Sequence, residues 1–161
     1  MTAPGPTPSQ TIGPFFRFAM DWLGGSNNGP NTVAGTVFDG AGDPVPDALL
    51  EFWLADASGG GHFGRCLTND HGGYEIATVK PGRVDDHQAP HIDVSVFARG
   101  LLNRLVTRIY FPDQAAANDV DPVLTAVPPD RRATLIARGE GDPLRFDIHL
   151  QGDQETVFFA W

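Results

Sequence analysis

The chain has 161 residues, a formal net charge of -9 at pH 7 and a single cysteine, Cys66. This length favours one domain with a substantial core, and the acidic balance argues against a nucleic acid or an anionic membrane as partner, because both would need a basic face. One cysteine excludes an internal disulfide framework, and 19 glycines with 14 prolines favour turns and short strands over long helices.

The N-terminal segment is rich in proline and predicts an extended arm. The arm ends in the aromatic pair Phe15-Phe16, which favours a position on a partner surface or across a groove, with a frayed terminus as the alternative. No signal peptide or apolar run of roughly 18 residues is visible, so we expect a cytoplasmic protein. We expect residues 1–31 to form the arm and a loop, and residues 32–161 to form one β-sandwich domain.

Apolar alternation and turn residues predict a series of short strands. They cover residues 32–38, 49–55, 66–68, 74–79, 91–99, 105–111, 144–150 and 156–161. The third and fourth strands are expected to form a hairpin, and so are the fifth and sixth, which are joined by a short loop containing Gly100. Short strands separated by turns fit an all-β sandwich better than a barrel with helices.

Two segments have helical character. Residues 113–118 predict a single helical turn. Residues 129–138 are the best helix candidate, because proline lies near the start, Arg138 in the last turn and Gly139 directly after it.

The residues alone offer little convergent catalytic chemistry. The five histidines are scattered, and no pair has the i, i+2 spacing that would aim two imidazoles of a strand at one metal. A strand over 91–99 places His91 and Asp93 on one face, but two ligands do not make a metal site, and a buried histidine without a metal is the alternative. Ser95 shares that face without a third group or an oxyanion loop, which argues against a hydrolase triad.

Eight segments do stand in the order found in one enzyme family. They are TPSQTIGPFF, LEFWLADASG, FGRCLTNDHGGY, VKPG, APHIDVSVFARG, TRIYF, RRATLIA and RFDIHLQGDQETVFF. Along nearly its whole length the chain therefore resembles the intradiol ring-cleaving dioxygenases. The resemblance implies a β-sandwich and an enzyme that cleaves a catechol with dioxygen at a non-haem Fe(III) held by two tyrosines and two histidines.

The same resemblance assigns the four metal-ligand positions to Gly61, Val84, His91 and Asp93. Of these, only His91 retains a side chain of the family's ligand set. An arginine that precedes the two histidines in catalytic chains falls near Gln88. The chain is therefore expected to bind no metal.

In members of the family built from two chains, an iron-bearing β chain pairs with an iron-free α chain of like fold. The resemblance implies that this chain is of the second kind, that Fe(III) is bound by the partner β chain, and that the pair forms a larger symmetric assembly. The residues matched to the pocket of the partner are Thr11, Gly13, Pro14, Phe15 and Arg99. Phe15 stands where the family often has tyrosine, whereas Arg99 suits the carboxylate of a substituted catechol, with a surface arginine as the alternative.

Two other functions remain open from the sequence. One is a non-enzymatic β-sandwich binding or scaffold module, and the other is a homo-oligomeric enzyme with an altered metal site built on His91 and Asp93. The chain is also shorter than expected for an α chain, chiefly after Trp22 and in residues 59–63. The number of protomers and the preference among substituted catechols are not visible in the sequence.

Overall fold

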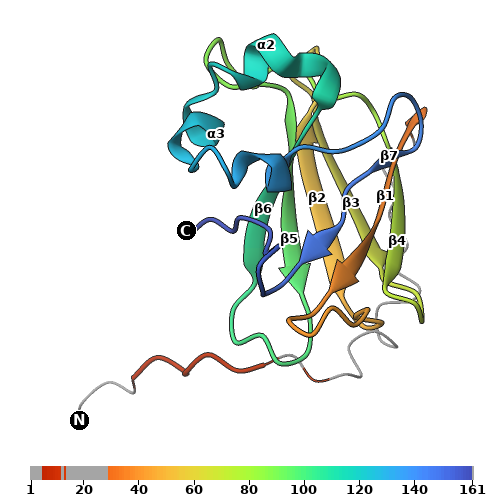
Figure 1. Ribbon diagram of the computed structural model, residues 1–161, viewed down its shortest axis with the longest axis vertical. Helices are drawn as coiled ribbons and strands as arrows, with labels where there is room; N and C mark the ends of the chain where they lie inside the picture. The colour runs from red at the N-terminus through yellow and green to blue at the C-terminus, as the bar shows by residue number, and fades with distance from the viewer. Residues whose placement is uncertain (1–4, 12, 14–28, 161) are drawn as a thin grey trace.

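Two four-stranded sheets packed face to face form the body of the computed structural model, which describes residues 5–11, 13 and 29–160 (Figure 1). In the first sheet β4 and β7 flank β1, and β8 also pairs with β1; the second has the order β3-β2-β5-β6. The strands are β1 (Asn31–Phe38), β2 (Leu49–Ala55), β3 (Gly61–Leu67), β4 (Gly73–Thr78), β5 (His91–Phe97), β6 (Leu105–Tyr110), β7 (Leu144–Arg145) and β8 (Ile148–His149). The predicted β-sandwich is confirmed.

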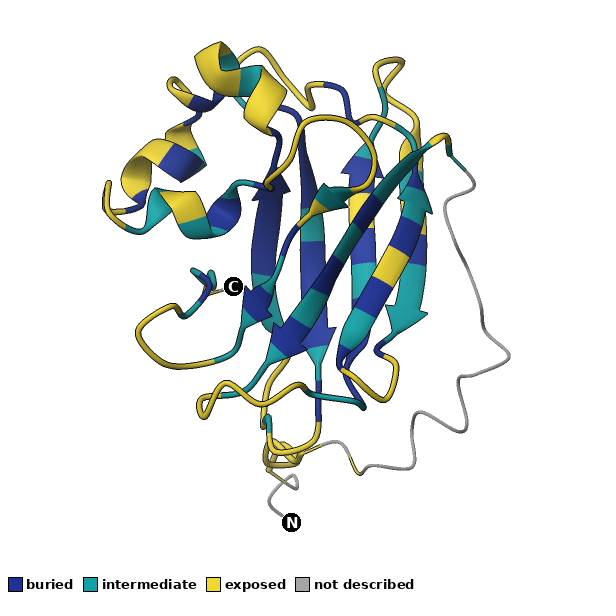
Figure 2. Cartoon of the chain, turned by 45° about the vertical axis from the view of Figure 1, so that its right-hand side comes forward, coloured by how far each residue is buried: buried dark blue, intermediate teal, exposed yellow. Residues whose placement is uncertain are grey.

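Alternating burial along the strands produces the core. In β5 the side chains of Ile92, Val94 and Val96 are fully buried in the core. Alternation between buried and more exposed residues is visible along β1 and β4 (Figure 2). Because side chains of a strand alternate between its two faces, His91 and Asp93 share the outer face, as predicted. The β5 and β6 strands form the expected antiparallel hairpin.

The predicted hairpin of the third and fourth strands is wrong. β3 pairs with β2, and β4 pairs with β1, so the chain crosses from one sheet to the other around residues 69–73. The turn itself forms, because Asn69 Oδ1 accepts hydrogen bonds of 2.9 Å from the backbone N–H groups of His71 and Gly73. Turn chemistry fixes a local reversal of the chain but not the sheet that the following strand joins.

The helical segments gather at one end of the sandwich (Figure 1). They are η2 (Pro112–Gln114), α2 (Ala115–Asn118), α3 (Pro122–Ala126) and η3 (Arg132–Leu135). The turn predicted at 113–118 corresponds to η2 and α2, whereas in the longer helix predicted at 129–138 only Arg132–Leu135 is helical, as the 3-10 helix η3. Its last residues take strand-like partners instead, since Ala137 N donates to Tyr110 O at 2.9 Å. None of the helices in the described part of the chain has the length and apolar character needed to cross a bilayer.

The C-terminal region is less regular than predicted. The strand expected over residues 144–150 is divided into β7 and β8, because the side chain of Asp147 takes the backbone N–H of Thr36 at 2.9 Å in place of a ladder bond. The strand expected over residues 156–161 is wrong. Within its described residues, 156–160, the assigned strand pairing is a single bridge from Phe159 to β6.

Candidate functional site

The four positions that the family resemblance assigns to metal ligands lie toward one end of the β3-β2-β5-β6 sheet. They are Gly61, Val84, His91 and Asp93. The last residue of β2, Ala55, pairs with Gly61, and its carbonyl accepts a hydrogen bond of 2.8 Å from Gly82, in the loop that carries Val84. Two residues earlier in β2, Trp53 pairs with Asp93. The strand register thus brings three segments, distant in sequence, to one place.

The side chains at these positions do not fit a metal ion. Gly61 has no side chain, and Val84 is an exposed aliphatic residue. No group of three or more histidine, cysteine, aspartate or glutamate side chains within the described ranges could hold a metal. Intradiol dioxygenases use non-haem iron, and the donors present here do not supply the set of tyrosine and histidine ligands that the resemblance implies.

His91 is buried and engaged within its own chain. Its Nδ1 lies 2.7 Å from Ala89 O, and because a carbonyl only accepts, this nitrogen carries a proton. Nε2 lies 3.7 Å from Asp93 Oδ1, and the ring faces that of Tyr110 at a centroid distance of 5.7 Å. His91 is therefore a packed, hydrogen-bonded side chain of the strand.

Asp93 pairs with an arginine rather than with a metal. Arg108 of β6 lies directly opposite Asp93 in the sheet and donates from Nε to Asp93 Oδ1 at 2.9 Å. Nη1 of the same guanidinium donates to Gln88 Oε1 at 2.9 Å. Burial opposes ionisation of Asp93, but the hydrogen bond and charge of His91 and the charge of Arg108 outweigh it and lower the pKa of Asp93. The carboxylate is consequently ionised and compensated.

Tyr110 extends this network toward α3. Its hydroxyl lies 3.4 Å from Arg108 Nη1 and donates to Asp121 Oδ1 at 3.1 Å. Burial is the main reason that the pKa of Tyr110 rises to about 12, so the phenol keeps its proton at neutral pH. The sequence motifs do not single out Tyr110. The signal that would have revealed its role is its place opposite His91 in the predicted hairpin.

The arm contacts the other end of β5. Gly100 N donates to Thr11 Oγ1 at 2.6 Å, and Ser9 Oγ donates to Asn103 Oδ1 at 3.2 Å. The described part of the arm therefore lies against the β5–β6 loop, at the end of the sandwich away from the helices (Figure 1). Gly13 is exposed, and a Cβ added there would meet open space among the described residues. The two further arm positions matched to the partner's pocket, Pro14 and Phe15, lie outside the described residues.

Arg99 stands beside this arm contact and forms an ion pair. Its Nε lies 3.0 Å from Asp47 Oδ2; the Arg99 side chain is 59% exposed and that of Asp47 only 9%. Among the residues that the structure describes, no hydrogen bond or ion pair is assigned to either terminal nitrogen of Arg99. Asp47 thus orients the guanidinium from one side and leaves its outer edge open.

Two aromatic side chains lie on the surface next to Asp93. Trp53 and Phe63 are both exposed, with ring centroids 4.5 Å apart. Arg65 lies 5.4 Å from the Phe63 ring and pairs with Glu51 at 2.5 Å. Exposed aromatic pairs edged by charge are typical of protein interfaces.

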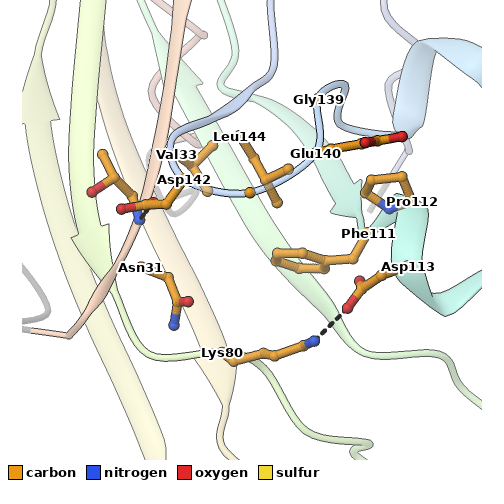
Figure 3. A pocket seen from close by; sticks show the side chains of 12 residues that line it. Asn31, Val33, Lys80, Phe111, Pro112, Asp113, Gly139, Glu140, Asp142 and Leu144 are labelled. Atoms are coloured by element: carbon orange, nitrogen blue, oxygen red, sulfur yellow. Dashed lines mark hydrogen bonds and ion pairs between the residues drawn. The ribbon is translucent and has the colours of Figure 1, made fainter.

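A cavity of ≈590 Å³ opens between the two sheets near the helical end (Figure 3). Val33, Phe111 and Leu144 provide its apolar walls, and an ion pair of Lys80 with Asp113 borders it. None of the predicted site residues lines this cavity. It is distinct from the candidate site, which lies on the outer face of β5.

The two-sheet sandwich is a fold of the intradiol ring-cleavage type. A family model described as Dioxygenase matches residues 19–152, and the chain belongs to this family. A protocatechuate 3,4-dioxygenase alpha chain from Burkholderia cepacia is 39% identical over 195 aligned positions, which cover 99% of each chain. A protocatechuate 3,4-dioxygenase beta chain from the same organism is 34% identical over 77% of this chain and 65% of its own length.

Among solved structures, the dioxygenase domain of a carbohydrate-binding fusion protein from Streptomyces sp. SirexAA-E has a TM-score of 0.62 and 29% identity, covering 79% of this chain and 82% of that one. These relatives confirm the family that the sequence motifs indicate. They also show that this chain is a subunit of the alpha-chain type and that the enzyme is an oxidoreductase. The 195 aligned positions exceed the 161 residues of this chain, so the alpha-chain relative has segments that this chain lacks.

Proposed function

We propose that this chain is the non-iron-binding alpha subunit of a protocatechuate 3,4-dioxygenase. It completes the active-site pocket of an iron-bearing beta chain, which cleaves protocatechuate with dioxygen to 3-carboxy-cis,cis-muconate. The observation that carries the proposal is the donor set at the assigned ligand positions, where a glycine, a valine and an ion-paired aspartate leave His91 alone. Fe(III) accordingly belongs to the beta chain.

The distance between the two ends of β5 supports a role toward another chain. His91 opens the strand and Arg99 follows its end. Six residue steps of strand separate His91 from Phe97, or about 20 Å at 3.3 Å per residue. Arg99 and the arm therefore lie too far away to serve the His91 end of their own chain. Thr11, Gly13, Pro14, Phe15 and Arg99 are proposed to line the pocket of the beta chain.

The proposal includes an assembly. Alpha-chain and beta-chain relatives together indicate a hetero-oligomer, and the exposed pair of Trp53 and Phe63 agrees with a buried interface. We place residues 1–31 in the arm and loop that reach the partner, residues 32–161 in the domain, and the symmetric assembly of alpha–beta pairs in the cytoplasm.

Iron content and turnover test the proposal directly. The chain purified alone should contain no stoichiometric iron and cleave no protocatechuate, whereas the chain co-expressed with a beta chain should yield an active complex with one iron per pair. Metal analysis and oxygen uptake measure both quantities, and the beta chain purified alone is the control. One iron per chain in the lone protein would refute the proposal.

Substituting His91→Ala in the assembled complex should leave kcat/KM for protocatechuate within about twofold of the unsubstituted value, because the described polar contacts of this histidine are with Ala89 O and Asp93 Oδ1 in the same stretch of chain. The measurement needs a parallel check of assembly, since His91 is buried. His71→Ala, in an exposed turn, is the control. A collapse of turnover in an intact complex would instead favour a catalytic homo-oligomer with an altered metal site.

A further inference from the structure

We propose that Arg108 supplies the positive charge at the four assigned metal-ligand positions, and that its guanidinium both holds the surrounding groups in place and excludes a metal ion. The inference rests on the proposed function in one respect, the assignment of ligand positions to His91 and Asp93. It goes further by naming the residue that makes the site closed to metal.

The position of Arg108 supports this role. It lies in β6, between Asp93 across the hairpin and the loop that carries Gln88, and its side chain is only 9% exposed. Nε donates to Asp93 Oδ1 at 2.9 Å, and Nη1 donates to Gln88 Oε1 at 2.9 Å, with Tyr110 Oη at 3.4 Å. One buried group thus connects three segments of the site.

Arg108 supplies a permanent positive charge to a site in which His91 also contacts Asp93. Among the residues that the structure describes, Arg108 is the only lysine or arginine assigned a hydrogen bond or ion pair with Asp93, Gln88 or Tyr110. Tyr110 in turn donates to Asp121, a second buried carboxyl group. A guanidinium keeps its charge at all working pH values. It therefore supplies permanently the positive charge that metalloproteins obtain from an ion.

The same geometry explains why a metal would not enter. A cation bound to His91 Nε2 and the side chain at position 93 would lie next to the guanidinium and be repelled by it. Displacing Arg108 would leave a nearly buried charge without partners, which is costly. Exchanging the second ligand alone should consequently not create a metal site.

The test uses the lone chain and Ni²⁺ as the probe. Four proteins are compared by calorimetric titration: the unsubstituted chain, Asp93→His, Arg108→Gln and the double variant Asp93→His/Arg108→Gln. The double variant has two histidines at i, i+2 on one strand face and no guanidinium. We expect it to bind Ni²⁺ at least about tenfold more tightly than Asp93→His alone, which corresponds to about 1.4 kcal/mol.

Two results would overturn the proposal. One is Ni²⁺ binding by Asp93→His as tight as that of the double variant, and the other is a folded double variant that binds no Ni²⁺. Asp93→His/Arg108→Lys restores a positive charge and should again bind poorly. If glutamine prevents folding, Arg108→Met keeps the apolar stem in the same comparison, and tight binding by Asp93→His alone still refutes the role.

Thermal unfolding gives a second, independent measurement. Arg108→Gln should lower Tm by about 5–10 °C, because Asp93 and Gln88 lose their partner. Arg104→Gln is the matched control, since Arg104 is exposed just before β6. An equal fall in both variants would contradict the proposal. Ni²⁺ binding by the lone chain tests the role of Arg108, whereas the iron content of the complex tests the proposed function. Either claim can therefore fail without the other.

Discussion

Replacing Arg99 with glutamine in the assembled enzyme should lower kcat/KM for protocatechuate by about 10- to 100-fold. A charge-assisted hydrogen bond from a guanidinium to a carboxylate contributes about 1.5–3 kcal/mol, which sets this range. On the proposed role, Arg99 binds the substrate carboxylate equally before and after ring cleavage, so most of the loss should appear in KM rather than in kcat. Steady-state oxygen uptake with the purified complex measures both constants.

The structural basis is the way Asp47 holds Arg99. The ion pair uses Nε, 3.0 Å from Asp47 Oδ2, on a side chain that is 59% exposed. Among the described residues, neither terminal nitrogen of the guanidinium is given a hydrogen bond or ion pair. Asp47 Oδ1 is buried without a hydrogen-bond partner among the described residues, so the aspartate depends on Arg99 for compensation. Asp47→Asn should weaken this orientation and raise KM in the same direction, by less than the loss of Arg99 itself.

Two controls separate substrate binding from loss of structure. Arg104→Gln removes an exposed arginine from the same loop and should leave KM unchanged. Catechol, which lacks the carboxylate, should be turned over equally by the Arg99→Gln complex and by the unsubstituted one. A comparable loss with catechol, or with Arg104→Gln, would show that Arg99 acts on the loop and not on the substrate.

The sequence predicts best the elements whose signals are local. The limits of β2, the β5–β6 hairpin and the shared outer face of His91 and Asp93 all follow from alternation and a short glycine-containing loop. The pairing of β3 and β4 does not follow, because the turn at Asn69 reverses the chain identically whether or not the next strand joins the same sheet.

Other parts were recoverable but missed. Asp121-Pro122 is a helix-start signal, an N-cap aspartate before proline, and α3 begins there. Arg108 is the one charged residue of β6, whose other residues are mostly apolar, and a charge in that position predicts a buried partner. Identifying Asp93 as that partner requires the register of the hairpin, since sequence distance alone does not place them opposite each other.

Asp121 joins the site to the helical end, and Asp121→Ala should lower the free energy of unfolding by about 3–5 kcal/mol. The carboxyl group is 0% exposed and accepts four hydrogen bonds. The donors are Ala89 N, Tyr110 Oη, Val123 N and Leu124 N. Alanine would leave these donors without their acceptor, remove the cap of α3 and release the loop that precedes β5.

Urea unfolding followed by circular dichroism measures the change, with Asp119→Ala as the matched control. Asp119 is two residues earlier and exposed, so its substitution should alter the free energy of unfolding by no more than about 0.5 kcal/mol. Asp121→Asn, which keeps one acceptor oxygen, should fall between the two. A loss of less than 1 kcal/mol for Asp121→Ala would mean that water replaces the carboxylate, and that the helical end is not tied to β5 through this residue.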